Sequence, residues 1–291
     1  MRRESIAFIG AGVMGRSMAE HLLSAGYPLF LYSRTRSKAE PLLAKGAVWR
    51  DSPAEAASEA DVAISMVGYP QDVETVYLGE SGILKSLRKG ALAIDMTTSS
   101  PLLAKRIAEA GAANGIGILD APVSGGDSGA REARLSIMVG GEREHFDRAL
   151  PILEIMGKNI VYQGAAGAGQ HTKMCNQIAI AGGMVAIAES LAYAKSAGLD
   201  PETVLKSISA GAAGSWSMSN LVPRALQGDF EPGFYVKHFI KDMGIAIESA
   251  SEMGLELPGL AMAKRLYDEL AEKGNGNLGT QALFQRCLSD G

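Results

Sequence analysis

A glycine-rich loop near the start of the chain has the composition of a phosphate-binding turn. It directly follows a short apolar run, Ile6–Ile9, and precedes a segment of helical character. The loop consists of Gly10, Ala11, Gly12, Val13, Met14 and Gly15. The first glycine permits a tight turn, the second lets the backbone approach a pyrophosphate, and the third lets the helix pack closely against the strand. The helix N-terminus would then face the phosphates, so the loop predicts a dinucleotide-binding site rather than a plain strand-to-helix turn.

The end of the second predicted strand bears on which dinucleotide would bind. An NAD site usually carries Asp or Glu there, because a carboxylate accepts a hydrogen bond from the ribose 2′-hydroxyl. This chain has Ser33, Arg34 and Thr35 instead. A guanidinium binds a 2′-phosphate through two hydrogen bonds, whereas a carboxylate would repel it. We therefore expect NADP in preference to NAD. The alternative is that Arg34 and Arg36 are solvated surface charges.

A second glycine-containing segment follows the predicted strand Ile116–Ala121. Ser124 supplies a hydroxyl group there, and Gly125 and Gly126 expose backbone N–H groups. Ligands of open α/β sheets bind at the carboxyl ends of the strands, and such a group of donors can hold an anion. The segment predicts a site for a substrate carboxylate, with a purely structural turn as the alternative.

Lys173 lies in the first turns of a long apolar helix that we expect over Gln170–Ser196. A cation is disfavoured near a helix N-terminus, and burial disfavours the ammonium further, so this side chain is suited to proton transfer. Asn176 and Gln177 follow at i+3 and i+4 on the same face of the helix. The alternative is a lysine whose charged end reaches solvent at the helix terminus.

The elements that must position these residues change in type along the chain. The first half alternates β-branched runs with Ala-rich helical segments, which is typical of a parallel sheet covered by helices on both faces. The predicted strands are Ile6–Ile9, Leu29–Tyr32, Val62–Met66, Leu92–Asp95, Ile116–Ala121, Ser136–Val139 and Ile160–Tyr162. Helical patterns fill the second half, at Pro201–Ala210, Tyr235–Met253, Pro258–Lys273 and Gly279–Leu288. We therefore predict an α/β domain over residues 1–163 and an all-α domain over residues 164–291 that includes the long helix.

Composition and charge exclude several classes of protein. The 291 residues are 47% hydrophobic and 21% charged, and the net charge of −4 lacks the basic excess of a nucleic-acid binder. Cys175 and Cys287 make neither a metal-binding spacing nor a disulfide framework. The longest uncharged stretch, Met174–Ala188, is shorter than the roughly 20 apolar residues of a membrane span. We expect a cytoplasmic protein without metal, nucleic-acid or membrane partners. The apolar long helix would suit the interface of a homodimer or homotetramer.

Four sequence blocks, in the same order along the chain, resemble those of the β-hydroxyacid dehydrogenases. This family includes 3-hydroxyisobutyrate dehydrogenase, tartronate semialdehyde reductase and glyoxylate/succinic semialdehyde reductase. The blocks are Gly10–Gly15, Asp120–Gly126, Gly167–Gln177 and Lys241–Asp242, and the resemblance covers nearly the whole chain. It implies a Rossmann domain, a long interdomain helix and an all-α domain. It also implies NADP-dependent interconversion of a small β-hydroxy acid, or of a hydroxy acid such as glycolate or 4-hydroxybutyrate, and its semialdehyde.

The resemblance also implies roles for individual residues. Lys173 matches the family's catalytic lysine, and Ser124, Gly125 and Gly126 match its substrate-carboxylate loop. The positions that match its cofactor contacts are Met66, Val67, Thr98 and Lys241, and those that match residues bordering its active site are Phe234 and Asp242.

Two positions depart from the family pattern. Many members carry Asn four residues after the lysine, where this chain has Gln177 preceded by Asn176, so which amide contacts the substrate stays open. The family commonly has glycine where this chain has Ala133, for which we expect a local change in the loop at most.

Three other functions fit the sequence less well. Imine reductases share the architecture but typically lack the lysine. The 6-phosphogluconate dehydrogenases are longer chains with a larger helical domain. A dinucleotide-binding module without catalysis would be expected to have lost the lysine or the Ser-Gly-Gly loop. Because Lys173 and Ser124–Gly126 are both present, the sequence favours a dehydrogenase or reductase.

Overall fold

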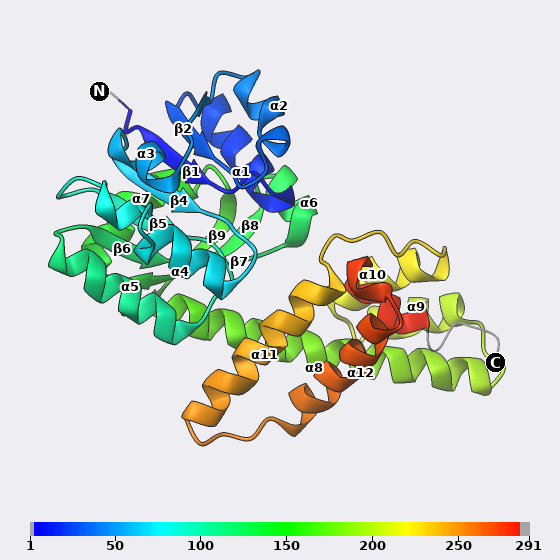
Figure 1. The fold of residues 1–291 in the computed structure, drawn as a ribbon. Coiled ribbons are helices and arrows are strands. Elements are labelled where there is room, and N and C mark those ends of the chain that lie inside the picture. Colours follow the sequence, from blue (N-terminus) through cyan, green and yellow to red (C-terminus); the bar gives the residue numbers. More distant parts are fainter. Residues whose placement is uncertain (1–2, 286–291) are drawn as a thin grey trace. The chain divides into compact units, whose positions relative to one another are not determined.

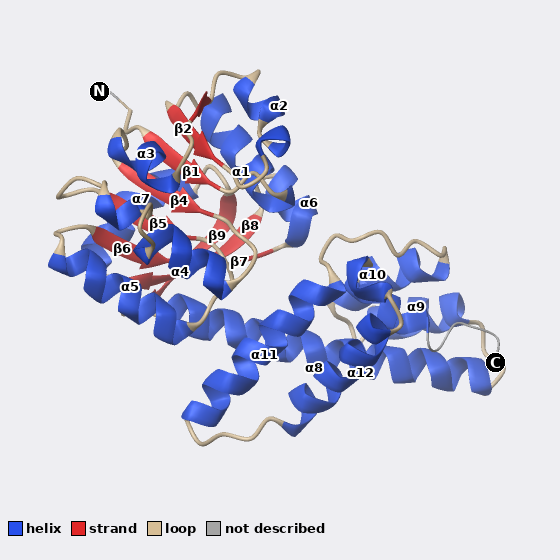
Figure 2. Ribbon diagram, viewed as in Figure 1, coloured by secondary structure: helices blue, strands red, loops and turns tan. Residues whose placement is uncertain are grey.

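The computed structural model describes residues 3–285 and divides into two compact units (Figure 1). The first unit, Met1–Lys173, combines a sheet with helices, and the described part of the second, Met174–Gly291, is helical (Figure 2). This confirms the predicted fold class. The helix α8 (Ala168–Ser196) begins in the first unit and continues into the second. The compact units therefore meet ten residues after the predicted domain boundary, because the start of α8 is bonded to the sheet unit, as described below.

The first unit is built on one sheet, which within the described residues has nine strands in the order β3-β2-β1-β4-β5-β6-β8-β7, with β9 beside β8. The strands are β1 (Ile6–Ile9), β2 (Leu29–Tyr32), β3 (Val48–Trp49), β4 (Val62–Ser65), β5 (Leu92–Asp95), β6 (Gly117–Asp120), β7 (Val123–Ser124), β8 (Leu135–Gly141) and β9 (Gly157–Gly164). Every predicted strand overlaps one of these. The two-residue strands β3 and β7 were not predicted, since they are too short to show a period of two.

The expectation of an entirely parallel sheet is wrong at one edge. Strands β1 to β6 pair in parallel, but β8 runs antiparallel to both β6 and β7. The chain between β6 and β8 holds β7 and the six-residue helix α6 (Gly126–Arg131), and it reverses direction over α6 so that β8 returns beside β7.

Both faces of the sheet are covered, as predicted. Along β1, Ile6 and Phe8 belong to one hydrophobic cluster and Ala7 and Ile9 to another, so successive side chains of this strand are buried on opposite faces. The helices of this unit, besides α6 and α8, are α1 (Val13–Ser24), α2 (Glu40–Leu43), α3 (Pro53–Ser58), α4 (Pro70–Leu78), α5 (Pro101–Ala113) and α7 (Arg143–Leu153).

Ala133, in the turn between α6 and β8, adopts the left-handed conformation with φ of 51°. This conformation costs a residue with a Cβ about 1 kcal/mol and costs glycine little. Glycine at this position would avoid most of that cost.

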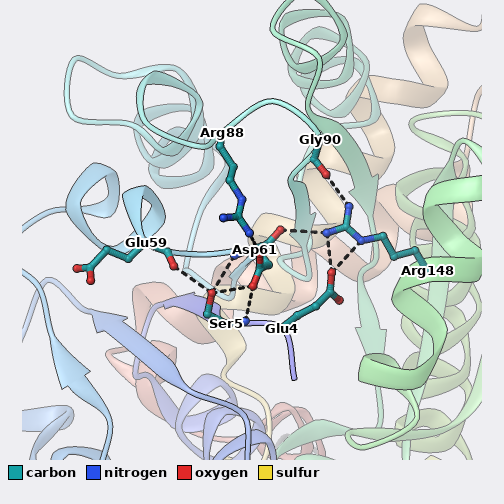
Figure 3. Close-up of polar contacts among 7 residues, drawn as sticks. All are labelled: Glu4, Ser5, Glu59, Asp61, Arg88, Gly90 and Arg148. Carbon is teal, nitrogen blue, oxygen red and sulfur yellow. Dashed lines mark hydrogen bonds and ion pairs between the residues drawn. The ribbon is translucent and has the colours of Figure 1, made fainter. Parts of the chain in front are cut away.

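A polar network closes the amino ends of the central strands (Figure 3). Ser5 precedes β1, and its backbone N–H and hydroxyl both donate to the carboxylate of Asp61, which precedes β4, at 2.8 and 2.9 Å. Arg148 of α7 donates to the carboxylate of Glu4 and to the carbonyl of Gly90, each at 2.7 Å. Because these residues precede their strands, the network lies at the end of the strands opposite to the glycine loop, which follows β1.

As far as residue 285, the second unit consists of helices packed around one hydrophobic core. Besides its part of α8, it contains α9 (Pro201–Ser209), α10 (Trp216–Leu226), α11 (Val236–Glu252), α12 (Pro258–Glu272) and the short 3₁₀ helices Asn275–Asn277 and Thr280–Phe284. The core includes Met184, Phe239, Met243, Tyr267 and Phe284. The helix predicted over residues 279–288 is the 3₁₀ turn Thr280–Phe284 as far as residue 285, and its last residues lie outside the described part.

The helix α8 is long and apolar enough to cross a membrane by length and composition alone. Its most apolar 18-residue window has a mean hydropathy of 1.4, and 39% of that window is buried inside the protein. A core helix of a soluble protein meets the same criterion. Met174, Ala181, Met184, Ile187 and Leu191 of α8 all belong to the core of the second unit, which accounts for much of the helix's apolar composition.

Candidate functional site

The three glycines of the loop between β1 and α1 differ in how much space surrounds them. Gly10 has φ of +108°, and a Cβ there would lie 2.2 Å from the carbonyl oxygen of Met66. A Cβ at Gly15 would lie 2.0 Å from the carbonyl oxygen of Gly10. A Cβ at Gly12 would meet no protein atom within 4 Å. Gly10 and Gly15 are therefore required by the protein's own packing, whereas the space at Gly12 is open and fits the close approach of a pyrophosphate to the backbone.

The other residues of the loop, Ala11, Val13 and Met14, lie in the turn or at the start of α1. Ala11 is buried, and its N–H donates to the hydroxyl of Ser33 at 3.2 Å. This bond joins the glycine loop to the end of β2, 22 residues further along the chain. Val13 and Met14 begin α1, and Val13 is 51% exposed. The structure thus gives Ser33 a positioning contact with the loop.

Arg34 extends into solvent beyond β2, with its side chain 85% exposed. Its Nη1 lies 3.3 Å from a carboxylate oxygen of Asp72, in the first turn of α4. Thr35 follows, also exposed. An exposed ion pair of this kind contributes little free energy, so the guanidinium can exchange Asp72 for a stronger anionic partner.

A buried aspartate at the end of β5 holds the two loops that carry Met66, Val67 and Thr98. One carboxylate oxygen of Asp95 accepts hydrogen bonds from the hydroxyl of Ser65 at 2.8 Å and from the N–H of Thr97 at 3.1 Å. The hydroxyl of Thr97 accepts in turn from the N–H of Val67 at 3.0 Å. Met66, Val67 and Thr98 are half-buried beside this network. The structure therefore brings these three predicted cofactor residues onto neighbouring strand ends.

Asp95 should make the stability of the protein depend on pH. Burial raises its pKa to about 6, although the bonds from Thr97 and Ser65 lower it, whereas the unfolded value is about 3.9. The folded state binds the proton more tightly, so the stabilisation is complete below pH 4 and is lost as the pH rises through 6. The free energy of unfolding of the wild type relative to Asp95→Asn should fall by about 2 kcal/mol from pH 4 to pH 7. Urea unfolding across this range measures it, and a constant difference would contradict the prediction.

The predicted carboxylate loop lies at the antiparallel edge of the sheet. Ser124 ends β7 and pairs with Ser136 of β8, and it is half-buried. Gly125 and Gly126 both have positive φ, of 130° and 63°, and Gly125 is exposed. Glycine adopts a positive φ at little energetic cost, unlike other residues. The two glycines therefore allow the chain to turn from β7 into α6.

The first turn of α8 is bonded to the sheet through Asp120 and Gln170. The carboxylate of Asp120, at the end of β6, accepts from the N–H groups of Gly167 at 2.7 Å and Gln170 at 2.8 Å. Burial raises the pKa of Asp120 to about 6, against the effect of these bonds. The buried amide of Gln170 donates to the carbonyl of Thr97 at 2.8 Å and accepts from the N–H of Ser99 at 2.9 Å. Lys173, 6% exposed, follows one turn later in the same unit.

The second unit joins four of the predicted residues by polar contacts. The amide nitrogen of Asn176 donates to the amide oxygen of Gln177 at 2.7 Å, and the amide nitrogen of Gln177 donates to Asp242 at 2.7 Å. The other carboxylate oxygen of Asp242 lies 2.9 Å from the ammonium of Lys241. Phe234 packs edge-to-face against the core residue Phe239, with ring centroids 5.7 Å apart. Both ends of the Gln177 amide are therefore engaged by protein groups.

Sequence reasoning missed four residues that shape the candidate site within the first unit: Asp95, Thr97, Asp120 and Gln170. Asp95 and Asp120 each end an apolar strand, and a carboxylate at the carboxyl end of a buried strand is a signal that sequence alone offers. Nothing local marks Gln170 as a partner of residues 71 and 73 positions away. Within residues 3–285, no group of three or more His, Cys, Asp or Glu side chains is arranged to hold a metal.

Comparisons with known proteins cover nearly the whole chain. The model described as the NAD-binding domain of 6-phosphogluconate dehydrogenase matches residues 5–164, and that described as NAD-binding of NADP-dependent 3-hydroxyisobutyrate dehydrogenase matches residues 167–287. An uncharacterized oxidoreductase of Bacillus subtilis is 61% identical over 97% of this chain and 98% of its own. The 2-hydroxy-3-oxopropionate reductase of Escherichia coli is 38% identical over 96% of each chain. The solved structure of Mycobacterium tuberculosis 3-hydroxyisobutyrate dehydrogenase with L-serine is similar with a TM-score of 0.91 and 32% identity, covering 99% of this chain and all of that one.

Proposed function

The chain belongs to the β-hydroxyacid dehydrogenase family of NAD(P)-dependent oxidoreductases, and on this premise we propose that it uses NADPH to reduce a small semialdehyde acid to the hydroxy acid, and catalyses the reverse reaction with NADP⁺. The observation that carries the proposal is Lys173. Its side chain is buried in the first turns of α8. These turns belong to the same unit as the glycine loop, and the sheet connects the two. A lysine so placed has a chemical use that a solvated surface lysine lacks.

The proposed reaction divides its work between the cofactor and Lys173. When bound, the nicotinamide supplies a hydride to the carbonyl carbon of the substrate. Lys173 donates a proton to the carbonyl oxygen as negative charge develops there, and the neutral amine accepts a proton in the reverse direction. The hydroxyl product thus carries one hydride and one proton, and solvent returns the proton to the amine.

We assign the substrate's carboxylate to Ser124, Gly125 and Gly126. Within the second unit, the Gln177 amide donates to Asp242 and accepts from Asn176, so its role is to orient these neighbours.

A substrate screen tests the proposed function. Purified protein would be assayed for NADPH oxidation with glyoxylate, succinic semialdehyde, tartronate semialdehyde and methylmalonate semialdehyde. We expect turnover with at least one of these acids and much weaker turnover with the matching aldehydes that lack the carboxylate. Equal rates with and without the carboxylate, or turnover of cyclic imines alone, would contradict the proposal.

A bulky residue at Gly125 should weaken binding of the acid. Gly125 has φ of +130° and its N–H belongs to the proposed carboxylate loop, so Gly125→Val disturbs both the turn and the donor. We expect KM for the acid to rise at least about 10-fold, equivalent to ~1.4 kcal/mol, while the dissociation constant for NADPH changes little. Steady-state kinetics and fluorescence titration measure the two. Loss of NADPH binding with an unchanged KM would assign this loop to the cofactor instead.

Arg34 should set the preference for NADPH over NADH. Its guanidinium is exposed and pairs with Asp72, and a bidentate bond to the 2′-phosphate should favour NADPH at least about 10-fold in kcat/KM. Arg34→Asp should reverse this preference toward NADH. Arg143→Asp is a matched control, since that arginine is similarly exposed and forms an ion pair on α7. Equal kcat/KM values for the two cofactors in the wild type would refute this role.

A further inference from the structure

We infer that Gln170 is a positioning residue that fixes the proposed proton donor, Lys173, relative to the loop Thr97–Ser99. The inference rests on the proposed function for Lys173 and goes beyond it. Gln170 is fully buried, at 0% exposure. A buried amide carries a large desolvation cost unless both its ends are bonded. Here both ends are bonded, and both partners are main-chain groups of a single loop.

The geometry of the two bonds defines a clamp around one residue. The nitrogen of the Gln170 amide donates to the carbonyl of Thr97, and the oxygen accepts from the N–H of Ser99. Thr98, which the family resemblance places beside the nicotinamide, lies between these two anchors. A two-point bond to the residues on either side of Thr98 fixes the position and the direction of that loop's backbone.

The same clamp fixes Lys173, because Lys173 follows Gln170 by three residues on α8. Residues at this spacing share one side of a helix, so a helix whose Gln170 side chain points to the Thr97–Ser99 loop presents Lys173 on that side. The backbone N–H of Gln170 is held by Asp120 at the same time. A Cβ at Gly169 would lie 2.4 Å from the carbonyl oxygen of Met138, so the first turn of the helix is packed against strand backbone.

The clamp matters for catalysis because proton and hydride must arrive at adjacent atoms of one carbonyl. Catalysis of this kind is sensitive to displacements of about 1 Å, which can cost roughly 10²-fold in rate. Loss of the clamp should therefore lower kcat with little effect on binding of cofactor or acid, since the glycine loop and Ser124 are held by other contacts.

Gln170→Met tests the inference, since methionine fills a similar volume without either hydrogen bond. Gln281→Met is the matched control. Gln281 is 1% exposed, and its amide nitrogen donates to the backbone carbonyls of Asp229 at 3.2 Å and Glu231 at 3.1 Å, in the second unit. Both variants lose bonds from a buried glutamine to main-chain groups, but only one of them lies next to Thr98 and Lys173. If Gln170→Met does not fold, Gln170→Glu replaces it, because it keeps an acceptor for Ser99 and loses the donor to Thr97.

Two measurements are compared between the variants. The first measurement is of kinetics and binding: kcat, KM for the acid, and the dissociation constant for NADPH. The second needs no substrate: it is the rate at which Lys173 is methylated by formaldehyde and cyanoborohydride, followed by peptide mass spectrometry. In Gln170→Met we expect kcat to fall about 10-fold or more, binding constants to stay within about threefold, and methylation of Lys173 to accelerate. Gln281→Met should change neither kcat nor the methylation rate.

The outcomes separate this inference from the proposed function. Equal effects of the two variants on kcat would overturn the positioning role, as would a Lys173 methylation rate that Gln170→Met leaves unchanged. A protein that turns over none of the tested acids would refute the proposed function, and the methylation rates would still decide whether Gln170 holds Lys173.

Discussion

Lys173→Ala should lower kcat by about 10²–10⁴-fold, the usual scale for losing general acid–base catalysis. The side chain is buried in the first turns of α8, and without it the developing alkoxide has neither a nearby positive charge nor a proton donor. Binding of NADPH should change little, because the proposed pyrophosphate site is the glycine loop between β1 and α1. Steady-state kinetics and fluorescence titration of NADPH measure the two effects.

Lys173→Arg is the informative companion variant. It keeps the positive charge but cannot deprotonate in the working pH range, so we expect a loss of kcat similar to that of Lys173→Ala. Recovery of most of the activity in Lys173→Arg would mean that charge alone suffices. Near-normal turnover in Lys173→Ala would transfer the proton donor's role to His171 or to water, and the proposed mechanism would have to be withdrawn.

Two alanine substitutions in the glycine loop should separate cofactor binding from stability. At Gly12 a Cβ meets no protein atom within 4 Å, so Gly12→Ala should change the free energy of unfolding by less than about 0.5 kcal/mol. The dissociation constant for NADPH should nevertheless rise at least about 10-fold, or ~1.4 kcal/mol, because the methyl group takes space that the pyrophosphate needs. Urea unfolding and fluorescence titration give the two values.

At Gly15 the same change should damage the fold itself. The Cβ of Gly15→Ala would lie 2.0 Å from the carbonyl oxygen of Gly10 and 3.2 Å from the ring of Phe8, and overpacking of this kind costs typically 1–3 kcal/mol. Binding of NADPH should weaken as well, since the loop must move. Gly259→Ala is the control, because a Cβ there also meets nothing within 4 Å and it lies on α12. If Gly12→Ala bound NADPH normally, the loop would not hold the pyrophosphate.

The sequence by itself determined the features that local physics decides. A glycine loop between an apolar run and a helix is recognisable because turn, close approach and packing each require glycine at a fixed spacing. The strands of the sheet follow from runs of β-branched and apolar residues, and the long helix α8 follows from 29 mostly apolar residues without a proline. The cofactor class and the fold class rest on these signals, and on four blocks that lie in family order.

The tertiary structure alone decided which polar groups meet. The bonds of Gln170 to Thr97 and Ser99 span 73 and 71 residues, that of Gln177 to Asp242 spans 65, and that of Asp120 to the backbone of Gln170 spans 50. The periodicity of the sequence does not predict such pairs, because the local sequence around each residue is compatible with many different hydrogen-bond partners. Whether a polar side chain is buried depends on which distant residues pack around it. The position of Asp95 at the end of an apolar strand therefore marks the residue but does not predict its raised pKa.

The same reason explains the two structural departures. The reversal of β8 is seen in its antiparallel pairing with β6 and β7, and β7 is a strand because Val123 and Ser124 pair with Ile137 and Ser136. The first turns of α8 belong to the sheet unit because Asp120 and Gln170 hold them there, although their composition reads as part of one continuous helix. Local sequence specified the elements and the chemistry that they could carry. Contacts between distant residues then decided which of those groups are held together, because burial and hydrogen bonding are properties of the assembled fold.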